Sequence, residues 1–215
     1  ETELRERLIV QAYEKISNHY QALAHQEEPN HATPAYELME GENPYQAPAH
    51  LLAVRDSGDL GLDKFKQLSG TKPCFTNMAD LDSLIKLMCV LVETFLTNEG
   101  KAPYITIAAK HGNPCGLSLS WDVPGESVDR ALFSNPRAIW GGEVITNFPI
   151  SEEIAHKLFQ SQKRNKILGD SYWMLDLVAA PEFEQGAIRL LGKRSSRKLF
   201  QNSALFEPRL DRSPW

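Results

Sequence analysis

Apolar residues recur at helical spacing in two long segments of the chain. Over residues 3–24, Leu, Ile, Ala and Tyr side chains repeat every three or four positions, which predicts an amphipathic helix. The clearest helix is predicted over residues 80–98, where Leu, Met, Val and Phe side chains form one apolar stripe. Asp80 or Asp82 can cap the start of this helix, and Gly100 follows its last turn.

Shorter apolar runs predict strands between the helices. Residues 104–109 are rich in β-branched side chains, as in a strand inside a sheet that is covered on both faces. Strands that alternate with helices predict a mainly α/β sandwich. The other predicted elements are helices over residues 129–133 and from 151 to about 164, strands within residues 140–147, 173–179 and 188–191, and a turn or short helix over residues 181–185.

The chain divides into three parts by composition. Residues 1–34 combine the first helix with a polar linker that contains two prolines. Residues 35–191 hold the predicted α/β unit, in which the Gly and Pro residues of 41–48 favour an ordered turn. Residues 192–215 are basic and then polar, and form a C-terminal tail for which no element is predicted.

Composition and charge narrow the possible partners. The 215 residues carry a net charge of −5, which argues against nucleic acid as the main partner. Lys86 and Glu93 interrupt the longest apolar run, so we expect no membrane span. The start at Glu1, without an apolar signal core, suggests a processed, trimmed or fragmentary chain. Three cysteines at unrelated spacings predict no disulfide framework and favour the cytoplasm.

The sharpest chemical feature is Lys110-His-Gly-Asn-Pro-Cys-Gly116, which follows a predicted strand. The glycines, Asn113 and Pro114 predict a turn whose backbone amides can face a ligand. An ammonium group beside an imidazole favours the neutral imidazole, the form that acts as a general base. The same residues also fit a surface turn that happens to contain Lys and His, and the spacing alone leaves both interpretations open.

A zinc site is a third interpretation of this segment. His111 and Cys115 are four residues apart, and zinc deaminases combine a His with a Pro-Cys-x-x-Cys pair. Here Pro114-Cys115 is followed by Gly-Leu-Ser, and no His-x-Glu element is present. Because two of the three ligands are missing, we expect no metal.

Five motifs in the same order resemble the AICAR transformylase family. Lys110-His-Gly-Asn-Pro-Cys-Gly116 resembles the family's Lys-His-x-Asn-Pro-Cys-Gly signature. Gly41-Glu-Asn-Pro-Tyr-Gln46 resembles the end of its Arg-Tyr-Gly-Glu-Asn-Pro-His-Gln motif. The other three are Gly70-Thr-Lys-Pro-Cys-Phe-Thr-Asn77, Asn135-Pro-Arg-Ala-Ile-Trp-Gly-Gly142, which resembles Asp-Pro-x-Ser-Ala-Phe-Gly-Gly, and Asp176-Leu-Val-Ala-Ala-Pro181, which resembles a strand that ends in Ile-Ala-Pro.

The resemblance implies a fold and an assembly. It implies a cytidine-deaminase-like three-layer α/β/α sandwich with a mixed sheet, preceded by the N-terminal lead-in helix. The chain resembles the first of two similar subdomains of the transformylase half of a bifunctional enzyme that is also an IMP cyclohydrolase. Active sites of the family lie at a homodimer interface, so a homodimer is expected here.

The resemblance also implies a reaction and the residues that perform it. The amine of AICAR attacks the formyl group of 10-formyltetrahydrofolate, the co-substrate, with His111 as general base and Lys110 as electrostatic partner. The residues that match substrate-binding positions are Asn77, Asn113, Trp140, Gly141 and Asp176. For Asn77 a capping role, for Trp140 a core role and for Asp176 a strand-end role remain the structural alternatives.

The chain departs from the family where the ribotide phosphate is expected. Met39-Glu40 stands in place of the family's Arg-Tyr, and a carboxylate there would repel a phosphate. Lys193-Arg-Ser-Ser-Arg-Lys198 could bind phosphate instead, although a charged tail is more often solvated. Two functions therefore stay open, a formyltransferase and a non-catalytic half-domain that binds a ligand or a partner.

Overall fold

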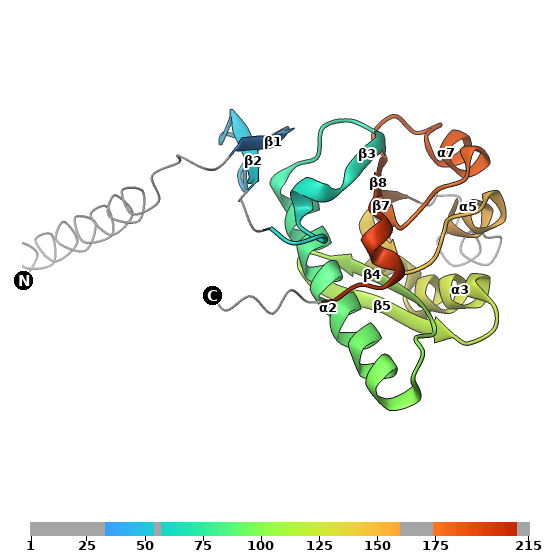
Figure 1. Ribbon diagram of the computed structural model, residues 1–215. Coiled ribbons are helices and arrows are strands. Elements are labelled where there is room, and N and C mark those ends of the chain that lie inside the picture. The colour runs from blue at the N-terminus through green and yellow to red at the C-terminus, as the bar shows by residue number, and fades with distance from the viewer. Residues whose placement is uncertain (1–32, 54–56, 160–173, 210–215) are drawn as a thin grey trace, which may run out of the picture. The chain divides into compact units, whose positions relative to one another are not determined.

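A six-stranded mixed sheet forms the centre of the protein (Figure 1). The computed structural model describes residues 33–53, 57–159 and 174–209. The strand order is β3-β8-β7-β6-β4-β5, and β1 and β2 form a separate two-stranded sheet. The strands are β1 Thr33–Leu38, β2 Ala49–Ala53, β3 Lys66–Ser69, β4 Tyr104–Lys110, β5 Asn113–Ser120, β6 Gly142–Thr146, β7 Leu175–Ala180 and β8 Lys198–Gln201.

Strand direction brings the ends of several strands to one edge of the sheet. β6, β7 and β8 run parallel to one another, whereas β4 runs antiparallel to both β6 and β5. The carboxyl end of β4 therefore lies beside the amino ends of β5 and β6, and the starts of β7 and β8 continue the same edge. The motif that begins at Lys110 is delivered to this edge.

Helices cover both faces of the sheet and make it the middle of three layers. One apolar core packs α2 against side chains from β4, β6, β7 and β8, and a second packs the other helices against the opposite face. Successive side chains of β4 point to opposite faces of the sheet, so Ile107 packs in the first core and Ala108 in the second. The helices are α2 Phe75–Glu99, α3 Pro124–Ser134, α4 Pro136–Ile139, α5 Glu152–Phe159 and α7 Gln185–Leu191, with 3-10 turns η1 Leu62–Lys64 and η2 Ser203–Phe206.

The predicted three-layer α/β/α fold is confirmed, and α2, α3, α5, β4, β6 and β7 lie where the sequence predicts helices and strands. Strands β1, β2, β3, β5 and β8 and helix α4 were not predicted. Helix α2 ends at Gly100, whose φ of 71° is the left-handed cap that glycine favours. The helix begins earlier than predicted, with Cys74 as its N-cap, so the prediction that Asp80 or Asp82 caps it is wrong. None of the described helices is long and apolar enough to cross a membrane.

Two differences lie near the C-terminus. The predicted strand over residues 188–191 is wrong, because these residues end helix α7, whose buried Leu190 and Leu191 pack on the sheet. Strand β8, inside the segment expected to form a tail, is an interior strand between β3 and β7. The predicted helix over residues 3–24, most of the linker before Pro34, and the predicted ends of elements at 164 and 173 lie outside the described residues.

Candidate functional site

A two-residue turn presents Lys110 and His111 at the edge of the sheet. Lys110 pairs with Asn113 across the β4–β5 hairpin, so the turn is narrower than predicted and consists of His111 and Gly112. Their φ values of 54° and 74° are both positive, as in a type I′ hairpin turn. The Asn113 side chain donates to the carbonyl of His111 over 2.9 Å, which stabilises this conformation. The His111 side chain remains exposed.

The backbone amides of the turn bind a protein carboxylate. Asp80, on the buried face of α2, accepts hydrogen bonds from the amide of His111 over 3.1 Å and from the amide of Gly112. Asp80 is 4% exposed. The expectation that these amides face a ligand is therefore wrong for both, because Asp80 already occupies them. The carboxylate instead anchors the turn to the helix.

Lys110 is held on the other side by the segment that precedes β6. Its Nζ donates to the carbonyl oxygen of Trp140 over 2.8 Å and lies 5.8 Å from the centroid of the indole ring. Gly141 has a φ of 75°, and a Cβ there would lie 3.8 Å from the same Nζ. The structure thus brings together Lys110, Trp140 and Gly141, three residues that the sequence places in two separate motifs.

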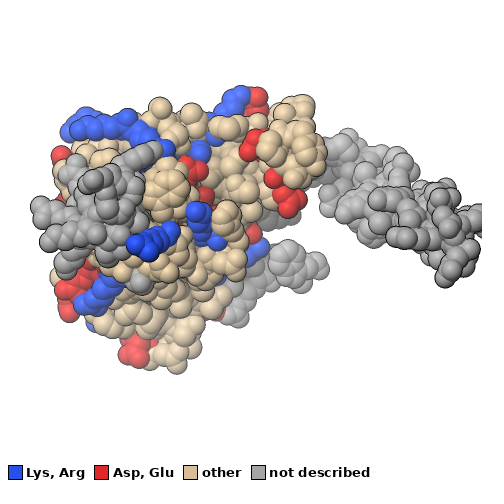
Figure 2. Space-filling model, turned by 180° about the vertical axis from the view of Figure 1, so that it is seen from behind, with Lys and Arg blue, Asp and Glu red and all other residues tan. Residues whose placement is uncertain are grey.

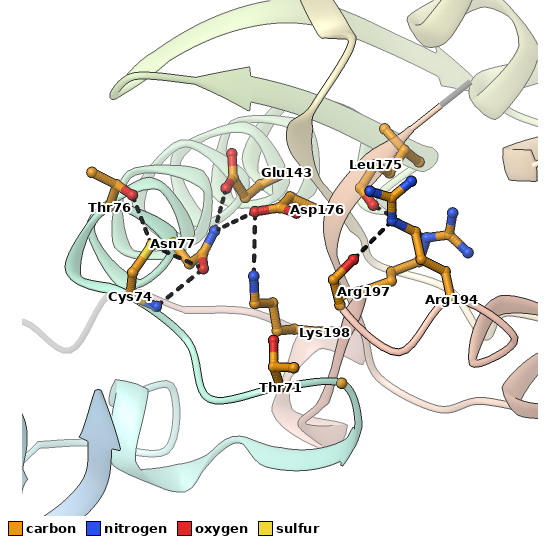
Figure 3. A network of polar contacts seen from close by, with 12 residues as sticks. Thr71, Cys74, Thr76, Asn77, Glu143, Leu175, Asp176, Arg194, Arg197 and Lys198 are labelled. Carbon is orange, nitrogen blue, oxygen red and sulfur yellow. Dashed lines mark hydrogen bonds and ion pairs between the residues drawn. The ribbon is translucent and has the colours of Figure 1, made fainter. Parts of the chain in front are cut away.

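A second group of polar side chains surrounds Asn77 (Figure 3). Asn77 Nδ2 donates to Glu143 Oε1 over 2.9 Å and to Asp176 Oδ2 over 3.2 Å. Lys198 Nζ lies 3.3 Å from the same Asp176 oxygen. Asn77 comes from the start of α2, Glu143 from β6, Asp176 from β7 and Lys198 from β8, so four elements meet in one network.

Asn77 caps the start of α2, and its amide nitrogen also joins the polar network. Its Oδ1 accepts from the backbone amide of Cys74 over 3.1 Å, which is half of a capping box at the start of α2. Its Nδ2 faces the network of Asp176 and Glu143. Capping therefore fixes the orientation of the amide group that reaches the site.

Glu143 is the site residue that the sequence did not reveal. It is 3% exposed and pairs with Ala109 of β4, directly before Lys110. Burial, and after it the neighbouring Asp80 carboxyl group, raise its pKa to about 9, while the hydrogen bond from Asn77 opposes the shift. Glu143 is thus a neutral carboxylic acid at neutral pH. The sequence did contain one feature that could have revealed Glu143, which is an acidic residue inside the apolar run of a buried strand.

The basic segment near the C-terminus is built into the fold. Arg197 is 1% exposed, and it donates from Nε to the carbonyl of Leu175 over 3.2 Å and from Nη1 to the carbonyl of Leu191 over 2.7 Å. Its guanidinium carbon lies 4.9 Å from the ring centroid of Phe159. Arg197 is therefore not part of a solvated tail. It is also not a phosphate ligand, because its donors bind backbone carbonyls. Burial lowers its pKa to about 10.

The segment expected near the ribotide phosphate lies beside the start of α2. The amide of Met39 donates to the carbonyl of Pro73 over 2.8 Å, and the amide of Phe75 donates to the carbonyl of Glu40 over 3.2 Å. The turn predicted over residues 41–48 is confirmed, and together with Phe75 it lines a cavity of about 570 Å³. These contacts join Met39 and Glu40 to the residues just before Asn77.

The described surface carries charges of both signs, and the described residues form no metal-binding group. On the face seen in Figure 2, Lys and Arg side chains occur in several separate groups with Asp and Glu among them. Within the described ranges, no group of three His, Cys, Asp or Glu side chains could hold a metal ion. The three cysteines are free, as expected from their spacing.

The AICARFT/IMPCHase bienzyme family model matches residues 1–212. The chain belongs to this family. The family predicted from the five motifs is therefore confirmed.

Similar proteins in the family are named bifunctional purine biosynthesis protein PurH. The one from Natranaerobius thermophilus is 33% identical over 165 residues, which is 77% of this chain and 26% of the relative. The one from Lacticaseibacillus casei is 29% identical over 198 residues, which is 89% of this chain and 33% of the relative. The chain thus spans between a quarter and a third of the length of these relatives.

Proposed function

We propose that this chain acts in purine biosynthesis by transferring a formyl group from 10-formyltetrahydrofolate to the amine of AICAR. The observation that carries the proposal is the hairpin turn that presents Lys110 and His111 at the edge of the sheet, with Lys110 in contact with Trp140. Membership of the family and the name of its relatives support the purine pathway. Free cysteines fit the reducing cytoplasm in which we expect the protein to act.

Each residue has a role that its surroundings support. The exposed imidazole of His111 removes the proton from the attacking amine, which is otherwise a poor nucleophile. The Lys110 ammonium, oriented by the Trp140 carbonyl, stabilises negative charge on the formyl oxygen or on the leaving folate nitrogen. The Trp140 ring stacks on the flat heterocycle. Asn77 and Asp176 hydrogen-bond the polar edge of the ribotide, and Asn113 fixes the turn.

The second candidate is a non-catalytic binding module. Met39-Glu40 places a carboxylate where the family has an arginine, and Arg197 is occupied by carbonyl groups. Loss of phosphate affinity would leave a fold that binds a partner and performs no transfer. In either case we propose a homodimer, which sedimentation velocity can test.

Calorimetry distinguishes the two functions. AICAR and a 10-formyltetrahydrofolate analogue are titrated separately into the full chain, with Trp140→Ala as the site variant and the exposed Trp121→Ala as its control. A formyltransferase binds both ligands at or below millimolar concentration, and Trp140→Ala weakens AICAR binding by about tenfold. No heat with either ligand at millimolar concentration would reject the formyltransferase.

A further inference from the structure

A buried acid lies behind the turn that carries Lys110 and His111. Glu143 Oε1 accepts the hydrogen bond from Asn77, whereas Oε2 is buried. Among the described residues, Oε2 is one of two buried side-chain polar atoms without a hydrogen-bond partner. An isolated carboxylate oxygen in this position would be costly, because it would be removed from water without compensation.

Two other acidic side chains, Asp80 and Asp176, lie close enough to Glu143 to raise its pKa. Asp80 on α2 accepts hydrogen bonds from the amides of His111 and Gly112, and its carboxyl group is also close enough to Glu143 to raise the pKa of that acid. A carboxylic acid can donate one hydrogen bond, whereas a carboxylate can only accept. The titratable groups that interact with Glu143 are Asp80 of α2, Cys115 of β5 and Asp176 of β7. Two cations lie next to these groups, with Lys110 of β4 acting on Cys115 and Lys198 of β8 paired with Asp176.

We propose that Glu143 is a positioning residue, which donates its proton from Oε2 to the Asp80 carboxylate and thereby fixes the turn that presents Lys110 and His111. The chain of contacts runs from Asn77 to Glu143, to Asp80 and then to the two turn amides. Its importance for catalysis rests on the proposed function, whereas its effect on the turn does not. Deprotonation of Glu143 places two carboxylates side by side and loosens the turn.

The test uses NMR spectroscopy on the full chain without any substrate. The variants are Glu143→Gln, which keeps a donor, and Glu143→Leu, which removes it, with the exposed Glu126→Gln as the matched control. We expect the amides of His111 and Gly112 to exchange with solvent about tenfold faster in Glu143→Leu and at nearly the original rate in Glu143→Gln. The carboxyl carbon of Glu143 in the unsubstituted chain should report the protonated form at pH 7.

Two outcomes would overturn this role. One is an ionised Glu143 carboxyl at pH 7 in the unsubstituted chain, which needs no variant to fold. The other is unchanged exchange of both turn amides in a folded Glu143→Leu chain. If no formyl transfer is measured but the turn amides of Glu143→Gln exchange at nearly the original rate, only the proposed function is rejected. If transfer occurs and Glu143→Leu leaves the turn unchanged, only the positioning role is rejected.

Discussion

The backbone amide of His111 donates a hydrogen bond to the side chain of Asp80, which lies 31 residues earlier in the chain. This contact joins the start of α2 to the turn after β4. It also explains why a turn with a positive φ at a histidine is stable, since the carboxylate binds both consecutive amides. The orientation of the candidate base is therefore determined by a residue outside its own motif.

Asp80→Ala should destabilise the fold by about 2 kcal/mol, because the two turn amides lose their shared hydrogen-bond acceptor. Chemical denaturation with urea measures the free energy of unfolding. Asp82→Ala is the matched control on the same helix, since Asp82 makes only an exposed ion pair with Lys86. The control should change stability by no more than about 0.5 kcal/mol. Equal effects of the two substitutions would contradict the anchoring role of Asp80.

Glu143→Gln should change how stability depends on pH. In the unfolded chain Glu143 ionises near its ordinary pKa of 4.5, whereas in the fold it keeps its proton up to a pKa of about 9. Between these values the folded state binds more protons, so Glu143 makes the fold less stable as pH rises, by at most about 1.4 kcal/mol per pH unit. Gln does not titrate and removes this slope.

The stability difference between Glu143→Gln and the unsubstituted chain should therefore grow in favour of the variant from pH 5 to pH 9. Urea unfolding at one-unit intervals of pH measures it, and the contributions of unchanged groups cancel in the difference. A difference that stays constant over this range would show that Glu143 is already ionised in the fold.

Arg197→Lys should destabilise the fold by about 1–3 kcal/mol. A lysine ammonium is a single point donor and cannot span the two carbonyls that the planar guanidinium reaches, yet it is still buried. The control is Arg130→Lys, where an exposed pair with Glu126 can form with either side chain. Thermal or urea unfolding measures the stability of both variants. Equal stability of Arg197→Lys and Arg130→Lys would contradict the structural role of Arg197.

Much of the fold could be predicted from periodicity alone. The apolar stripe of α2 and the β-branched run of β4 are long and regular, so their type and approximate position follow from the sequence. The end of helix α7 was predicted as a strand because a run of four residues with three aliphatic side chains is too short to show a distinguishing period. β8 was not predicted because its short sequence begins with Lys198, which only the tertiary fold buries.

Site residues that share one motif could be predicted from the sequence. Those that meet only because distant segments pack together were harder to predict. Lys110 and His111 stand together in the sequence, and family resemblance made Asn77, Trp140 and Asp176 candidates for substrate binding. The anchoring of the turn by Asp80 depends on a contact between α2 and the β4–β5 turn, which local patterns do not report. Glu143 was missed for the same reason, since its partners come from other elements.

The central claim is that Lys110 and His111 perform formyl transfer. The most direct measurement is the rate of tetrahydrofolate release from 10-formyltetrahydrofolate, with AICAR present and absent, for the full chain and for His111→Ala. The predicted result is AICAR-dependent release that falls by about 10²–10⁴-fold in His111→Ala, the range for loss of a general base. AICAR-dependent release at the same rate in His111→Ala would contradict the mechanism, and no AICAR-dependent release by the unsubstituted chain would contradict the function.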